Sequence, residues 1–119
     1  MRPAHDGEAA ELYGAAVNVA TDVFYTVPAG YILLIFAWSI TSRGNATAAC
    51  KLYTRDVADA TVISLWTHYY TEAAHLSDSL SCIVPWEVLA GHDLCLSNNV
   101  AGSYSYAHVH GILIPTGTV

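Results

Sequence analysis

The stretch that decides the fold runs from Val27 to Ser42 and reads VPAGYILLIFAWSITS. Its unbroken apolar run, Tyr31–Trp38, has eight residues, whereas a membrane-spanning helix needs about 20. Ahead of the run, Pro28 fixes its own φ and Gly30 permits a positive φ, which together are typical of a turn. The stretch therefore predicts a turn that leads into a long buried strand, and no membrane span.

The same organisation extends outward from this stretch in both directions. Short runs of β-branched and aromatic residues alternate with turn clusters, and no helical period is sustained. The expected strands are 12–19, 22–27, 31–42, 48–55, 61–71, 80–85, 93–97 and 104–114. Residues 72–79 are expected to form a loop or one helical turn. About eight strands with turns near every dozen residues predict an all-β sandwich, and their unequal lengths favour an eight-stranded jelly roll.

The composition predicts one domain with a partly covered surface. The chain has 119 residues, of which 54% are hydrophobic and 12% are charged, about half the usual charged share. We assign residues 12–119 to a single sandwich domain and residues 1–11, which are acidic and rich in small side chains, to an N-terminal arm. The low density of charged residues predicts that copies of the chain or another protein cover part of its surface. We expect the arm to serve attachment more than the fold.

The charge balance excludes several classes of partner. Only four residues are Lys or Arg and the net charge is −6, so the chain lacks the basic patch that nucleic-acid binding requires. Docking on anionic lipid is disfavoured for the same reason. The first residues contain no basic segment leading into an apolar one, so we expect no signal peptide.

Three cysteines, Cys50, Cys82 and Cys95, offer no metal or redox motif. Three residues cannot complete a disulfide framework, and none of them forms a CxxC pair. Two of them could pair, or all three could be buried free thiols. The second interpretation is favoured because free cysteine is among the most buried residue types.

His108 and His110 are the first candidates for chemistry. Residues i and i+2 of a strand point to the same face, so both imidazoles could reach one metal ion. The cupin class of small β-barrels uses such a pair, followed shortly by a glutamate, but here the apolar residues 111–115 follow. The third ligand would have to be one of His68, His75, His92 or Glu72. We therefore expect an aromatic and polar stripe shared with Tyr104 and Tyr106, and no metal or other cofactor.

The other candidate catalytic residues in the sequence are weakly supported. His92 and Asp93 are adjacent and so face opposite ways on a strand. Ser97 and Ser103 lack the Gly-x-Ser-x-Gly elbow of a hydrolase nucleophile. The glycines are scattered singly at turns and form no phosphate-binding loop. We expect no enzymatic activity.

The aromatic strand 61–71 predicts an interface. Trp66, His68 and Tyr70 alternate with other bulky residues, and only one face of a strand can meet the core of a two-sheet sandwich. Tryptophan and tyrosine are favoured in interface cores. A sugar-binding face would also expose aromatic residues, so that alternative stays open. The predicted interface residues are Trp66, His68, Tyr70, Tyr104 and Tyr106.

Three segments carry a resemblance to a known family. They are Thr26–Gly30 (TVPAG), Leu89–Leu94 (LAGHDL) and Gly111–Pro115 (GILIP). With the acidic start and the long apolar strand, they resemble small β-sandwich virion proteins of tailed bacteriophages. The resemblance implies a capsid decoration (cement) protein, often a homotrimer, that is made in the host cytoplasm and binds the major capsid protein on the virion surface. It implies no catalytic residues.

Two other functions remain as alternatives. The first is a cupin-like metal-binding β-barrel protein, which would use His108 and His110. The second is a carbohydrate-binding or receptor-binding virion module, which would use the exposed aromatic residues.

Overall fold

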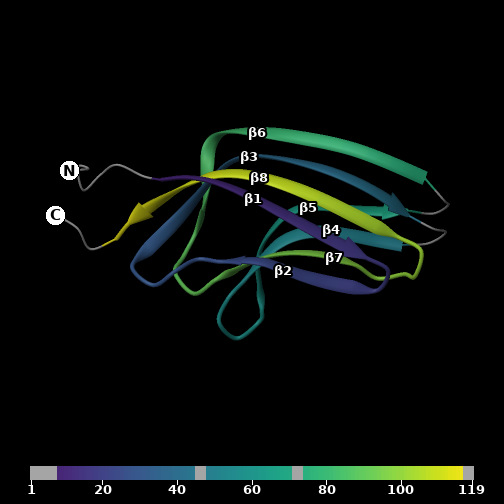
Figure 1. Cartoon of the computed structure of the whole chain (residues 1–119), viewed down its shortest axis with the longest axis horizontal. Coiled ribbons are helices and arrows are strands. Elements are labelled where there is room, and N and C mark those ends of the chain that lie inside the picture. Colours follow the sequence, from purple (N-terminus) through teal and green to yellow (C-terminus); the bar gives the residue numbers. More distant parts are fainter. Residues whose placement is uncertain (1–7, 45–47, 71–73, 117–119) are drawn as a thin grey trace.

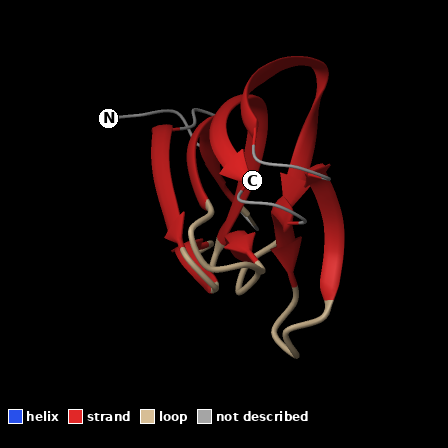
Figure 2. Ribbon diagram, turned by 90° about the vertical axis from the view of Figure 1, so that its right-hand side faces the viewer, coloured by secondary structure: helices blue, strands red, loops and turns tan. Residues whose placement is uncertain are grey.

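The chain folds as two antiparallel sheets packed face to face (Figure 1). The computed structural model describes residues 8–44, 48–70 and 74–116. Strands and short loops make up these residues, with no helix among them (Figure 2). The described part of the chain accordingly holds no helical segment of the length and apolarity that a membrane crossing requires. The predicted all-β sandwich is confirmed.

Each sheet has four strands. The first sheet has the order β1 (Glu8–Val17), β8 (Tyr104–Pro115), β3 (Tyr31–Gly44), β6 (Ala74–Val88). The second sheet has the order β2 (Ala20–Thr26), β7 (Asp93–Asn98), β4 (Ala48–Arg55), β5 (Thr61–Tyr70). Only β4 and β5 are successive strands within one sheet, and every other connection crosses between the sheets. This order agrees with the two-sheet wrapping of a jelly roll.

The core lies between the sheets and is centred on β3. Leu33 and Ile35 are fully buried, and Trp38 is 4% exposed. Strict alternation would turn Trp38 outward, but a β-bulge between Ile35 and Ala37 adds one residue and returns Trp38 to the core face. The long apolar run can therefore keep bulky side chains inside over its whole length.

The turn ahead of β3 forms as predicted. Gly30 has a φ of 83°, and the amide of Tyr31 donates to the carbonyl of Pro28 at 3.2 Å. A second turn packs beside it, because Gly91, with a φ of 81°, donates its amide to the carbonyl of Val27 at 2.8 Å. Both glycines occupy a backbone conformation that a Cβ disfavours.

The predicted boundary of the N-terminal arm at residue 11 is wrong. The first strand begins at Glu8 and pairs with β8, with Glu8 opposite Leu113. Ala10 points into the core and is 9% exposed, while Glu8 and Glu11 are exposed. Glu11 lies on the outward face, where a polar side chain is tolerated, and Glu8 is exposed because it is the first residue of the strand. The rest of the predicted arm, residues 1–7, lies outside the described residues.

The loop or helical turn expected at residues 72–79 is also wrong where the structure describes it. Residues 74–79 belong to β6, which runs for 15 residues. Leu76 and Leu80 lie opposite the core-facing Ser42 and Trp38 of β3, whereas Ser77 and Ser79 lie opposite the outward-facing Thr41 and Ser39. This alternation is the period of a strand.

Two of the three cysteines are free and buried, as favoured by the sequence. They are Cys50 and Cys95, each 0% exposed. The side chain of Cys82 lies outside the described part of the chain.

Candidate binding face on the first sheet

A stripe of four rings follows β8 on the outer face of the first sheet. Ser105, Ala107 and Val109 point into the core, so the residues between them face outward. The ring centroids of Tyr104 and Tyr106 are 5.4 Å apart, and those of His108 and His110 are 4.0 Å apart. We call Tyr104, Tyr106, His108 and His110 the β8 stripe.

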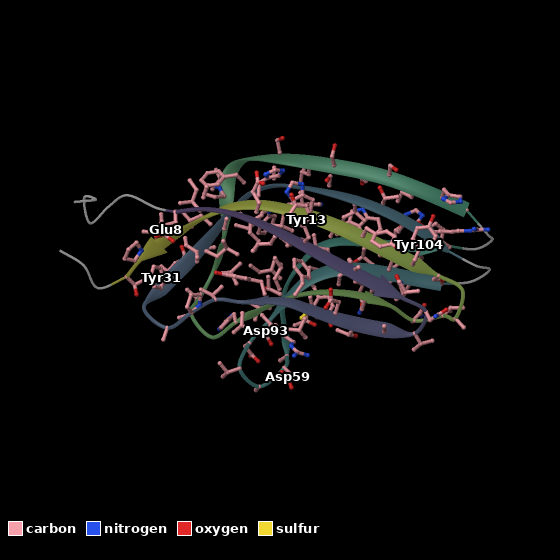
Figure 3. The ribbon with its side chains drawn as sticks, in the orientation of Figure 1. Glu8, Tyr13, Tyr31, Asp59, Asp93 and Tyr104 are labelled. Atoms are coloured by element: carbon pink, nitrogen blue, oxygen red, sulfur yellow. The ribbon has the colours of Figure 1, made fainter. Side chains whose placement is uncertain are left out.

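Strand β1 supplies an aromatic ring and a carboxylate beside the stripe. Tyr13 lies opposite His108 and stacks on it with ring centroids 4.2 Å apart and planes 12° apart. Tyr13 is nevertheless 66% exposed (Figure 3). Glu11 lies opposite His110, with its Oε1 3.5 Å from the histidine Nδ1.

Hydroxyl groups line the other side of the stripe. A pocket of about 320 Å³ lies between β3 and β6, lined by Ser39, Ile40, Thr41, Ser77, Asp78 and Ser79. The Thr41 and Ser77 hydroxyl oxygens are 3.5 Å apart. Thr41 also lies opposite Tyr106, which is 49% exposed. The pocket therefore adjoins an exposed aromatic ring.

Charge is scarce in the part of this face that surrounds the β8 stripe. Four rows of paired residues cross the sheet from β1 to β6: Glu11, His110, Ala37, Ser81; Tyr13, His108, Ser39, Ser79; Ala15, Tyr106, Thr41, Ser77; and Val17, Tyr104, Arg43, His75. With neutral histidines, Glu11 and Arg43 are the charged members of these rows. We call the four rows the outer face. It combines aromatic rings, hydroxyls and small side chains, which is a surface suited to contact with another molecule.

Two of the predicted interface residues lie on the outer face. Tyr106 is half exposed. Tyr104 is partly buried, and its hydroxyl lies 3.3 Å from Nδ1 of His75. Their role in an interface stays a prediction.

The other three predicted interface residues point toward the inside of the sandwich. Tyr70 is 3% exposed and its hydroxyl is hydrogen-bonded to Oγ of Ser42. His68 is partly buried with its ring edge-on to Tyr70 at 4.5 Å. Trp66 packs against the core and donates its Nε1–H to Asp78 at 3.1 Å. The prediction is wrong for Tyr70, which fills the core.

A β-bulge explains the error. Leu52 lies opposite Trp66, but the next residue, Tyr53, lies opposite Ser64, so Leu65 is the extra residue. Leu65 is 8% exposed and packs in the same core as its neighbour Trp66. Because of the bulge, Leu65 faces inward and so do the alternate residues that start at its neighbour Trp66. Tyr69, 71% exposed, is the aromatic residue that faces outward.

The structure brings the two candidate histidines together with an acid that the sequence analysis missed. One donor atom from each of Glu11, His108 and His110 lies within 4.8 Å of the other two. Glu11 is almost a hundred residues from the pair in sequence, so only the register of β1 against β8 reveals it. Of the third ligands weighed from the sequence, Glu72 lies outside the described residues, and the three histidines do not belong to this cluster.

Asp93, the acid of the His92–Asp93 pair weighed from the sequence, forms a structural link between strands. The carboxylate of Asp93 accepts hydrogen bonds from the Thr26 hydroxyl at 2.6 Å and from Nε of Arg55 at 2.9 Å. These bonds, that from Thr26 foremost, lower the pKa of Asp93 below its ordinary value. The carboxylate thus ties β2, β7 and β4 together.

Comparisons with known proteins add little to this description. No family model matches the chain, and no curated protein matches it. A solved chain described as "Structure of infectious bursal disease virus Gx strain" is similar with a TM-score of 0.38 and 12% sequence identity. The match covers 97% of this chain and 31% of that one, so this chain spans about a third of its length. A likeness this distant carries no argument about function.

Proposed function

We propose that the protein is a non-enzymatic structural subunit of a virion, a capsid decoration protein that works as a homotrimer on the head of a tailed bacteriophage. The observation that carries the proposal is the outer face, whose four rows cross all four strands of the first sheet with two charged residues and leave Tyr13 66% and Tyr106 49% exposed. Interface cores are enriched in tyrosine and depleted in charge. The resemblance at Thr26–Gly30, Leu89–Leu94 and Gly111–Pro115 favours the decoration role.

The outer face is assigned to contact between copies of the chain. A rigid sheet presents these side chains without ordering a loop, so association does not incur that entropic cost. A trimer then attaches to the major capsid protein at several points, and multivalent attachment strengthens binding beyond that of one copy. Because the trimer binds the assembled shell and not its loose subunits, it stabilises the shell by mass action.

Co-sedimentation with empty heads of the virus that carries this gene tests the proposal. The wild-type protein is expected to sediment with the heads, and a Tyr13→Ser, Tyr106→Ser double variant to bind at least about tenfold more weakly, a change of about 1.4 kcal/mol. Tyr69→Ser removes an equally exposed tyrosine from the second sheet and serves as the matched control. Failure of the wild-type protein to bind heads contradicts the decoration role.

The hydroxyl-lined pocket favours a second candidate function, glycan binding. A sugar ring could stack on Tyr106 while Ser39, Thr41 and Ser77 bond its hydroxyls. A glycan array tests it: a binder that is lost in Ser77→Ala and retained in Ser64→Ala supports a carbohydrate-binding virion module. An array without binders contradicts it.

A further inference from the structure

We propose that Glu11, His108 and His110 bind a divalent transition-metal ion, with Zn²⁺ the best fit. The proposal concerns a site on the outer face and does not rest on the proposed function. Two imidazoles and one carboxylate are a ligand set that Zn²⁺ accepts, whereas Mg²⁺ and Ca²⁺ prefer oxygen ligands alone.

The fold fixes the three residues next to one another. His108 and His110 share a face because they are two apart on β8. Glu11 is the direct cross-strand partner of His110 on β1, so its side chain emerges from the same face. The three donor atoms lie within 4.8 Å of one another. The expectation that no metal binds here assumed that no acid was near, and Glu11 removes that premise.

The three side chains lie close together but do not form good hydrogen bonds with one another. Stacking on Tyr13 holds the ring of His108, and its Nε2 is buried without a hydrogen-bond partner. The separation of 3.5 Å between Glu11 Oε1 and His110 Nδ1 is longer than a good hydrogen bond. An ion at this position would supply the missing interaction for the three side chains together.

To bind a metal ion, the three donor atoms need to move only slightly closer together. Ligand atoms about 2.1 Å from a tetrahedral Zn²⁺ lie about 3.4 Å apart. Rotation about side-chain bonds can supply this change, because the side chains of His110 and Glu11 are 45% and 59% exposed. The half-open position also leaves room for a water molecule as the fourth ligand.

Titration of untagged protein with ZnCl₂ by calorimetry tests the site, with Co²⁺ absorption as a second readout of the ligand geometry. We expect one ion per chain. Glu11→Gln and His110→Asn are each expected to weaken binding by at least about tenfold. His92→Asn and Glu87→Gln change a histidine and an acid outside the cluster, and they are expected to bind as the wild type does.

Both cluster variants alter half-exposed side chains, and circular dichroism without metal confirms that they fold. His108 is left unchanged because its ring packs on Tyr13. The proposal is overturned if the wild-type chain takes up no stoichiometric Zn²⁺. It is equally overturned if the cluster variants bind like the wild type, or if the control variants lose as much affinity as they do.

Discussion

Asp93 shows how one side chain joins three strands of the second sheet. Its carboxylate accepts hydrogen bonds from the Thr26 hydroxyl on β2 and from Nε of Arg55 on β4. Asp93 itself lies on β7. Arg55 also lies 3.4 Å from Asp59, in the turn that follows β4. Hydrogen bonds to an ionised carboxylate favour the charged form, and this is why the pKa of Asp93 is lowered.

The lowered pKa of Asp93 predicts a pH-dependent contribution to stability. A carboxyl whose pKa is lower in the folded than in the unfolded state stabilises the fold above its unfolded value, about pH 4, and loses this effect as the pH falls through the folded value. Asp93→Asn is therefore expected to lower the free energy of unfolding at pH 7. Urea titrations at several pH values should show the two proteins converging below about pH 4. A constant difference across that range would contradict the assignment.

Burial of the Cys50 and Cys95 thiols predicts that they react slowly with thiol reagents. Burial raises the pKa of both Cys50 and Cys95, so little of the reactive thiolate is present at neutral pH. In a Cys82→Ser background, we expect a thiol reagent to label neither cysteine in the folded protein and both in urea. Rapid labelling without denaturant would show that these strands open.

The positions of most strands could be predicted from the alternation of apolar residues and from the turn residues in the sequence. The bounds of β4 were predicted as residues 48–55, and the Pro28–Gly30 turn formed where its residues required it. The failures share one cause, since each needs cross-strand information. The start of β1 depends on β8, and the inward turn of Trp66 and Tyr70 depends on a bulge set by β4. The pairing of Glu11 with His110 could not be inferred from a sequence that separates them so widely.

The bulge in β5 decides which of two neighbouring tyrosines faces inward, and so which of them is sensitive to loss of its hydroxyl. Tyr70→Phe removes a buried hydroxyl that bonds Ser42, so we expect a loss of about 1–3 kcal/mol in the free energy of unfolding. Tyr69→Phe alters an exposed side chain, and its effect should stay within about 0.5 kcal/mol. Denaturant unfolding measures both. A larger loss for Tyr69→Phe than for Tyr70→Phe would mean that Tyr69, and not Tyr70, faces inward, as strict alternation from Leu65 without the bulge would place it.

For the whole molecule, the composition predicts that part of the surface is covered but does not locate that part. Fourteen charged residues in 119 are too few to coat every face evenly. The four rows of the outer face hold two charged residues, and Tyr13 and the β8 stripe lie together there. We propose that copies of the chain meet through this face.

The molecular mass in solution, measured by light scattering after size exclusion, tests whether copies of the chain associate through the outer face. We expect about three times the 12.7 kDa of one chain for the wild type and for Tyr69→Ser. We expect the mass of a single chain for the Tyr13→Ser, Tyr106→Ser double variant. A wild-type protein that stays at 12.7 kDa, or a trimer that survives the double substitution, would contradict this proposal.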